Sequence, residues 1–261
     1  MLKLGRLGAW NSAQKQAVIP FPQAVTEEMR NTMPSDITVV AFHTDDAFYT
    51  HEAERMCASA QRLGIPVKTT VVQSQGDWVK NTSFKAHFLE QARQDISGAM
   101  LYVDVDAVFH RSPLAYLSQL DCDIAAHYDE GDDHLISATL FFQDTPAAKQ
   151  LIEEWNRQCK LRPDVWDQKV LEDILAQDQQ QAQPQYRIQR LPVAFCWVFD
   201  RETNLAHLEK MPVYIEQLQA SRSVRDEVRK QGKKRLISRP SKQTQRRMDR
   251  VKQIEDILFG K

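Results

Sequence analysis

The run of residues 99–109 constrains the fold more than any other part of this 261-residue chain. It is apolar, as a buried strand is, except for two carboxylates one residue apart, Asp104 and Asp106. Side chains alternate along an extended strand, so both carboxylates should point to one side and reach one ligand. Open α/β sheets bind ligands beyond the carboxyl ends of their strands. Two hard oxygen ligands at such an end suit a divalent cation that carries substrate phosphates.

An Asp-x-Asp triplet is a weak signal by itself, because carboxylates also cap strands and begin loops. A second triplet, Asp121-Cys122-Asp123, occurs further along the chain. The position at the end of a hydrophobic strand, rather than the triplet, therefore favours a metal or phosphate site.

The composition, with 42% hydrophobic and 26% charged residues, is that of a globular protein with one large domain or two small ones. No apolar run reaches the roughly 18 residues that span a bilayer, and residues 1–15 lack the apolar core of a signal peptide. The four cysteines are scattered and form no CxxC pair: Cys57, Cys122, Cys159 and Cys196. We therefore expect a reduced, cytoplasmic protein with no transmembrane segment, zinc site or disulfide framework.

The charge is unevenly distributed. From Ser221 to the end there are 14 Lys or Arg against 5 Asp or Glu, about +9, so the rest of the chain carries about −10. Such a basic segment on an acidic body points to a polyanion: nucleic acid, anionic lipid or another acidic surface. Between Arg222 and Lys252 aromatic residues are nearly absent, which predicts phosphate-backbone contacts rather than base stacking. A solvated helix face without a partner is the alternative.

Strands and helices alternate through the first half of the chain, which predicts parallel βαβ units. We expect strands at residues 37–42, 67–72, 99–103, 122–127, 135–142, 186–191 and 213–215. We expect helices at residues 50–63, 83–92, 146–159 (capped by Thr145), 167–176 and 241–259, and a polar surface segment at 177–185. The chain divides into an N-terminal lead-in (1–35), an α/β domain (36–220) and a basic helical extension (221–261).

The last expected helix has an apolar stripe with helical spacing, made by Met248, Val251, Ile254, Ile257 and Leu258. One face of the extension should therefore pack on the body of the protein or on a partner.

With these elements in place, the sequence resembles the GT-A nucleotide-diphospho-sugar transferases, which are glycosyltransferases with an Asp-x-Asp metal site. Seven segments match in order: Phe42-His43-Thr44, residues 76–85, 101–109, 122–127 and 139–142, Trp166-Asp167-Gln168, and residues 219–222. The resemblance implies a mixed, mainly parallel sheet flanked by helices. It also implies transfer of a sugar from a nucleotide-diphosphate donor, a UDP-sugar first of all, to an acceptor hydroxyl with the help of Mn²⁺ or Mg²⁺.

The resemblance also implies the donor-binding residues. Asp106 is the expected main metal ligand, and Asp104 assists through the metal or the donor ribose. Lys85, at the start of a helix, approaches the diphosphate as a point charge, with Asn81 in the same pocket. Thr44, in the polar loop after the first strand, holds the base and ribose. For Lys85 the alternative is a solvated helix residue.

Asp167, beside Gln168, is the candidate for work at the reacting sugar, as a base or as a group that stabilises the oxocarbenium-like centre. Asp167 is also placed to be a helix N-cap. The family's metal-ligand His appears here as Gln217, a neutral and weaker ligand. His127 and His134 are candidates for the acceptor side, although a lone His is more often structural.

Three functions stay open on these observations. The basic segment holds DNA whose modified base is the acceptor, or it docks an enzyme on anionic membrane to glycosylate a lipid-linked or cell-surface saccharide. Alternatively the chain is a catalytically silent GT-A-like module that binds a nucleotide or polyanion, as Gln217 and the unusual Ala138 suggest. A phosphatase-like hydrolase with Asp104 as nucleophile has less support, because the downstream segments do not fit it.

Overall fold

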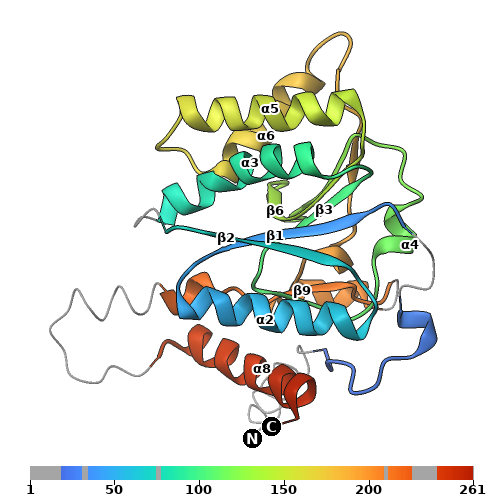
Figure 1. The fold of residues 1–261 in the computed structure, drawn as a ribbon, viewed down its shortest axis with the longest axis vertical. Coiled ribbons are helices and arrows are strands. Elements are labelled where there is room, and N and C mark those ends of the chain that lie inside the picture. Colours follow the sequence, from blue (N-terminus) through green and yellow to red (C-terminus); the bar gives the residue numbers. More distant parts are fainter. Residues whose placement is uncertain (1–18, 31–34, 75–77, 209–210, 225–239, 261) are drawn as a thin grey trace, which may run out of the picture.

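In the computed structural model, which describes residues 19–30, 35–74, 78–208, 211–224 and 240–260, six strands form a central sheet (Figure 1). Their order is β2 (Val67–Val72), β1 (Thr38–Thr44), β3 (Met100–Val103), β6 (Leu135–Phe142), β5 (Ile124–Tyr128) and β7 (Ile188–Arg190). The pairs β1–β2, β1–β3 and β5–β7 are parallel, and β6 runs antiparallel to both of its neighbours. This mainly parallel sheet confirms the expected fold class.

Helices cover both faces of this sheet (Figure 1). On one face lies α2 (Ala47–Arg62); on the other lie α3 (Trp78–Asp95), α5 (Pro146–Leu161) and α6 (Asp167–Gln179). The alternation of β1 explains the two layers: Val39 and Ala41 share a core with Met56 of α2, whereas Val40 shares one with Leu89 of α3. Each buried strand therefore needs apolar residues on both sides.

A second sheet of three short strands, in the order β4-β9-β8, lies on the α2 side. Its strands are β4 (Ala107–Phe109), β8 (Trp197–Val198) and β9 (Ile215–Gln217), and the nearby short helices are η1 (Glu27–Met29), α4 (Leu114–Leu117), η2 (Val193–Phe195) and η3 (Glu202–His207). The strand expected at residues 99–103 is β3, and residues 107–109 form a separate strand, β4, in the second sheet. A turn closed by the amide of Ala107 on the carbonyl of Asp104 (3.1 Å) separates β3 from β4. Asp104 and Asp106 share a side because of this turn, so the prediction from strand alternation was wrong in its cause.

Among the element boundaries that differ from the prediction, two change the placement of candidate site residues. β1 continues through His43 and Thr44, expected in a loop, because both residues pair with the end of β2. α3 begins at Trp78 rather than at residue 83, so Lys85 lies inside the helix and not at its start.

The N-terminal cap of α5 was predicted correctly from the sequence, and that of α6 was not. Thr145 caps α5 as predicted, accepting from the amide of Ala148 at 3.1 Å. The same hydroxyl donates to Asp123 (2.7 Å), which makes the second Asp-x-Asp triplet part of the scaffold. The N-cap of α6 is Trp166, so the N-cap role expected for Asp167 is wrong, and Asp167 is the first helical residue.

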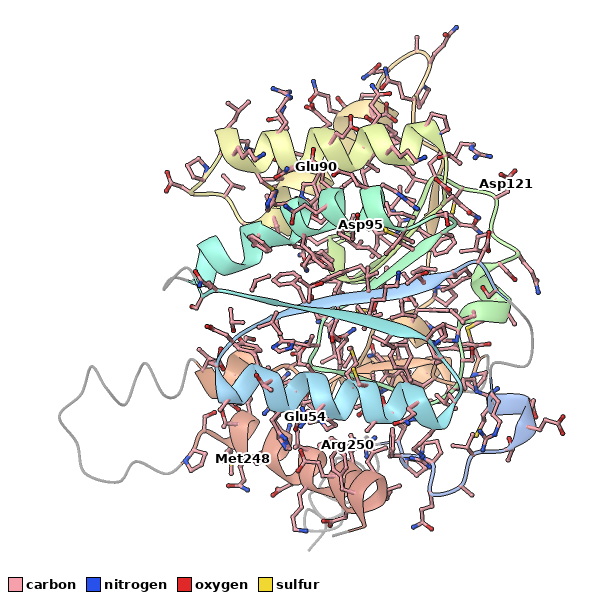
Figure 2. All side chains as sticks on the ribbon, viewed as in Figure 1. Glu54, Glu90, Asp95, Asp121, Met248 and Arg250 are labelled. Carbon is pink, nitrogen blue, oxygen red and sulfur yellow. The ribbon has the colours of Figure 1, made fainter. Side chains whose placement is uncertain are left out.

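The basic extension forms the predicted helix, α8 (Lys242–Phe259), which lies beside α2 (Figure 1). Ser241 caps it by accepting from the amide of Thr244 at 3.1 Å. Ile254 is buried against Phe21 of the lead-in, with the partly buried Val251, Ile257 and Leu258 around it. Met248, expected in the same stripe, is 49% exposed on α8 (Figure 2). None of the described helices is long and apolar enough to cross a membrane.

Candidate active site

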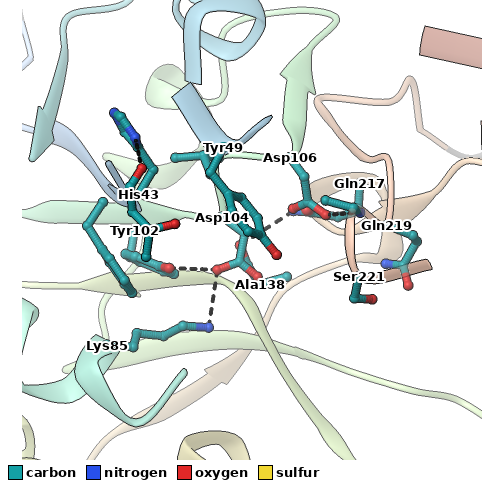
Figure 3. A pocket seen from close by; sticks show the side chains of 14 residues that line it. His43, Tyr49, Lys85, Tyr102, Asp104, Asp106, Ala138, Gln217, Gln219 and Ser221 are labelled. Atoms are coloured by element: carbon teal, nitrogen blue, oxygen red, sulfur yellow. Dashed lines mark hydrogen bonds and ion pairs between the residues drawn. The ribbon is translucent and has the colours of Figure 1, made fainter. Parts of the chain in front are cut away.

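A pocket of about 220 Å³ lies where β1 and β3 end (Figure 3). Five of the predicted site residues line it together: Thr44, Lys85, Asp104, Asp106 and Gln217. These residues come from β1, α3, the turn after β3, and β9. Segments that are far apart in the sequence therefore converge on one cavity at the carboxyl edge of the parallel strands, as expected for an open α/β sheet.

Asp104 is bound on one oxygen by two donors. The hydroxyl of Tyr102 donates to its Oδ1 at 2.6 Å, and Nζ of Lys85 lies 3.2 Å from the same atom (Figure 3). Burial, followed by the negative charge of Asp104, holds the pKa of Tyr102 well above its usual value. Tyr102 therefore stays protonated and acts as a fixed donor that orients the carboxylate.

Asp106 is held by the backbone of a different segment. Its Oδ2 accepts from the amide of Ala220 at 2.6 Å, and its carbonyl accepts from the amide of Leu218 at 2.9 Å. Burial and then the charge of Asp104 raise the pKa of Asp106 to about 6, although the Ala220 bond acts in the opposite direction. The two carboxylates therefore repel each other at neutral pH, and a cation placed between them would relieve that repulsion.

Lys85 is a buried cation shared by several groups. Its Nζ donates to the carbonyl and the hydroxyl of Ser137, both at 3.0 Å, and lies 3.5 Å from Oδ2 of Asp167. Burial lowers the pKa of Lys85, but the charges of Asp104 and Asp167 outweigh this effect and leave it raised. Lys85 therefore carries a positive charge at the edge of the pocket across the physiological pH range.

Asp167 and Gln168 do not line this pocket but lie behind Lys85. The buried Asp167 accepts on its carbonyl from the indole of Trp155 at 2.9 Å. Gln168 accepts from the amide of Ser137 at 3.1 Å. Burial raises the pKa of Asp167, with Lys85 opposing the shift. The structure thus links both residues to the pocket through Ser137 and Lys85, and their role at the reacting sugar stays a prediction.

The remaining predicted donor residues are placed as follows. Thr44 lines the pocket, and its hydroxyl donates to the carboxylate of Asp46. The side-chain nitrogen of Gln217 donates to the hydroxyl of Thr139 at 3.1 Å, so its carbonyl oxygen is the atom that can serve as a ligand. Asn81 belongs to α3, but its side chain lies outside the described part of the structure.

The two candidate histidines lie outside the pocket. His127 is buried, with Nδ1 3.1 Å from the carbonyl of Leu191, and burial lowers its pKa. His134 is at the surface, with Nδ1 3.0 Å from the carboxylate of Glu172 on α6. These contacts are of the kind that structural histidines make, and a role for either residue on the acceptor side stays a prediction.

Several pocket residues were missed by the sequence analysis. Tyr102 could have been identified from the sequence, because alternation along the extended chain puts its side chain on the same side as that of Asp104. Tyr49 lies in the first turn of α2, shortly after the end of β1, and belongs to no recognised motif. Ala220 contributes only its backbone amide, next to Gln219 in the left-handed region (φ 58°). No side-chain pattern reveals such a donor.

The open α/β sheet has a pocket with acidic and basic side chains at the carboxyl edge of its parallel strands, as many α/β enzymes do, and a family comparison identifies the class. Residues 39–223 match the family model of the nucleotide-diphospho-sugar transferases. Because this match covers well over half of the chain, the protein belongs to that family and is a glycosyltransferase. Among curated protein sequences no significant match is found.

Solved structures support the fold. A glycosyltransferase involved in glycosylation of the major capsid of PBCV-1 is similar at 14% identity, with a TM-score of 0.57 over 75% of this chain and 98% of that one. The galactosyltransferase LgtC, solved with donor and acceptor sugar analogues, matches 69% of this chain and 86% of its own at 13% identity and a TM-score of 0.46. GlyE of Streptococcus pneumoniae TIGR4 matches at 14% identity and a TM-score of 0.47, over 69% of this chain and 54% of its own. Of these three structures only the capsid glycosyltransferase has a TM-score above 0.5, and at 14% identity it supports the GT-A fold alone.

Proposed function

We propose that this protein transfers a sugar from a UDP-sugar to an acceptor hydroxyl in a reaction that depends on Mn²⁺ or Mg²⁺. The observation that carries the proposal is the convergence of Asp104, Asp106 and Lys85 on one pocket (Figure 3). Two carboxylates and a buried ammonium are the groups that a metal–diphosphate ligand requires at close range. UDP is the nucleotide implied by the family resemblance.

The proposed protein ligands fit a metal ion whose remaining coordination positions are filled by substrate phosphates and water. In the described residues no group of three or more His, Cys, Asp or Glu is arranged to hold a metal. A zinc site would need such a group, whereas Mg²⁺ and Mn²⁺ bind through one or two carboxylates together with substrate phosphates and water. We propose Asp106 and Asp104 as the ligands, with the carbonyl oxygen of Gln217 as a third. The bound ion would supply charge neutralisation of the departing diphosphate.

The protein's own side chains supply the rest. Lys85 presents a fixed positive charge to the diphosphate, and Asp167 and Ser137 hold its ammonium group in place. Tyr102 keeps the carboxylate of Asp104 in one orientation. We propose that Thr44 contacts the nucleoside, with Asn81 near the diphosphate, and that Asp167 and Gln168 lie nearest the reacting sugar.

The acceptor is the most open part of the proposal. We propose DNA with a modified base first, and a lipid-linked or cell-surface saccharide at an anionic membrane second. Arg222 pairs with Asp200 at 2.7 Å, and Arg247 and Arg250 are buried, so they add little to a polyanion surface. The cations that α8 exposes are Lys242, Arg246 and Lys252. A cytoplasmic location stays part of the proposal, supported by four free cysteines.

Calorimetric titration tests the donor site. UDP is titrated into the wild type, Asp106→Asn and the control Asp164→Asn, which changes an exposed acid, each with and without Mn²⁺. We expect metal-dependent binding in the wild type and the control and a loss of at least about tenfold in Asp106→Asn. GDP, CDP and ADP measured alongside establish the base preference. Equal affinity in Asp106→Asn would remove the metal-site assignment, and hydrolysis of a UDP-sugar without Mn²⁺ or Mg²⁺ would contradict metal dependence.

A further inference from the structure

The C-terminal helix α8 contacts β9 and α2, two elements that each contribute a residue to the pocket, Gln217 and Tyr49. Two of its arginines are each only 3% exposed and face acidic residues of different elements. Arg250 donates to both carboxylate oxygens of Glu216 on β9, at 2.8 and 2.7 Å. Arg247 lies 2.5 Å from the carboxylate of Glu52 on α2. Figure 2 shows Arg250 on α8 beside α2. A segment whose charge suggests a polyanion partner thus directs these two arginines into the protein.

The partner of Arg250 lies next to the residues that hold Asp106. Glu216 is 0% exposed and precedes the pocket residue Gln217 on β9. The chain then continues to Leu218 and Ala220, whose amides bind the carbonyl and the carboxylate of Asp106. The conformation of this segment therefore determines where the Asp106 carboxylate lies.

Other contacts of α8 are with residues 222 and 223, which follow the β9 segment, and with Phe48 on α2. Thr244 donates its hydroxyl to the carbonyl of Arg222 at 3.3 Å, and Arg247 donates to the hydroxyl of Ser223 at the same distance. Both acceptors follow directly on pocket residues 219–221. On the other side, the guanidinium of Arg247 lies over the ring of Phe48, at 5.4 Å from its centre. Phe48 adjoins Tyr49, which lines the pocket.

We infer that α8 is a built-in brace of the donor pocket, with Arg250 and Arg247 as positioning residues that fix the segment carrying the Asp106 contacts. Arg250 fixes β9, Arg247 fixes the start of α2, and the pocket lies between these elements. A planar guanidinium that binds a carboxylate through two nitrogens sets orientation as well as distance. The inference goes beyond the proposed function, and it relies on that proposal only in taking the pocket as the donor site.

The first experiment compares Arg250→Met with Arg246→Met, a matched control on the exposed face of the same helix. Hydrogen–deuterium exchange is followed in residues 215–222 and, as an internal reference, in β6. Affinity for UDP with Mn²⁺ and the donor KM are measured on the same proteins. For Arg250→Met we expect exchange in 215–222 to rise about tenfold with β6 unchanged, and donor affinity to fall about tenfold. Arg246→Met, whose proposed contact is with the polyanion and not with the donor, should match the wild type in exchange of residues 215–222, in UDP affinity and in donor KM.

A double variant separates positioning from simple charge neutralisation. Arg250→Met with Glu216→Gln removes both charges, so the thermal midpoint should return toward the wild-type value. Because the link between α8 and β9 is still missing, exchange in 215–222 and the donor KM should stay high. Recovery of all three quantities would overturn the inference, since Arg250 would then only neutralise Glu216. Uniform exchange increases in 215–222 and β6 of Arg250→Met would overturn it as well.

If Arg250→Met does not fold, Arg250→Lys takes its place, because lysine keeps the charge but binds through a single nitrogen. An intermediate rise in exchange and in donor KM supports the inference, and wild-type values of both contradict it. The exchange measurement needs no nucleotide, so failure of UDP to bind the wild type would count against the proposed function and leave this test of the brace intact.

Discussion

Asp106 and Glu216 are two acidic side chains beside the same β4–β9 ladder, and their surroundings are opposite. Glu216 is bound by both nitrogens of Arg250 and lies 2.6 Å from Nε2 of His110. Within the described part of the chain the carboxylate of Asp106 accepts from one backbone amide, that of Ala220, and it faces a second carboxylate, Asp104. Glu216 has a permanent cationic partner in Arg250, whereas Asp106 has a like charge as its neighbour.

The pKa values express this difference. Burial raises the pKa of Glu216, but Arg250 and His110 outweigh it and leave the pKa below its usual value. Burial and Asp104 together raise the pKa of Asp106 to about 6. Repulsion between ionised groups costs folding free energy, which a scaffold residue avoids and a binding residue tolerates. Arg247 and the Ala220 amide offset only part of the rise at Asp106, so Asp106, rather than the fully paired Glu216, is the acid suited to bind an exchangeable cation.

The largest effect should follow from substitution of Asp106. Asparagine keeps an acceptor for the amide of Ala220 but removes the negative charge, so we expect the transfer or donor-hydrolysis rate to fall about 10²–10³-fold. Steady-state rates at several Mn²⁺ concentrations measure it, with circular dichroism as a check of folding. A rate within twofold of the wild type at every Mn²⁺ concentration would show that the two acids do not differ as described.

The next largest effect concerns stability at Glu216. Glu216→Gln leaves the buried guanidinium of Arg250 without its counter-charge, and we expect the free energy of unfolding to fall by about 3 kcal/mol. Urea unfolding at pH 7 measures the change. The matched variant Glu255→Gln, on α8 with a more exposed side chain, should lose less. Equal losses would mean that the depth of the Glu216 pair has no special importance.

The order and type of the helices and strands could be predicted from the sequence, because hydrophobic periodicity and helix-capping residues are visible within each short segment. β2 and β6 occupy the predicted residues, and Thr145 caps α5. The central acids were identifiable because they are adjacent in sequence and end a hydrophobic run. Lys85 and Gln217 came from the resemblance alone, since nothing in their local sequence indicates a shared pocket.

The brace could not be predicted, because a count of charges does not show which of them are buried. Arg250 and its partner Glu216 are 34 residues apart, and their pairing depends on how α8 packs on the second sheet. The turn between Asp104 and Asp106 was also hidden, since a strand pattern continues across it. Tertiary contacts decide both features, and neither has a local signature.

A smaller effect, with the opposite sign, is expected for the stability of Asp106→Asn. A carboxyl with a raised native pKa binds its proton more tightly in the folded state, so its contribution lowers stability as pH rises from about 4 to about 6. Asparagine removes this penalty, and the variant should be more stable than the wild type by about 1–2 kcal/mol at pH 7, allowing for partial exposure. Unfolding curves between pH 4 and pH 7.5 should show the difference closing toward pH 4. A difference that widens as pH falls would contradict the raised pKa.

The smallest effect on stability belongs to an exposed cation of the same helix. Lys252 pairs with Asp256 one turn away, with the lysine side chain 74% exposed, so Lys252→Ala should change the free energy of unfolding by no more than about 0.5 kcal/mol. The polyanion hypothesis makes a separate demand on this residue: affinity for duplex DNA or for anionic vesicles should fall about two- to threefold, with a shallower salt dependence. Arg250, buried in the brace, should affect polyanion binding only as far as it disturbs the fold. If Lys252→Ala lost stability but kept its affinity for polyanions, Lys252 would be a structural residue and not part of a polyanion-binding surface.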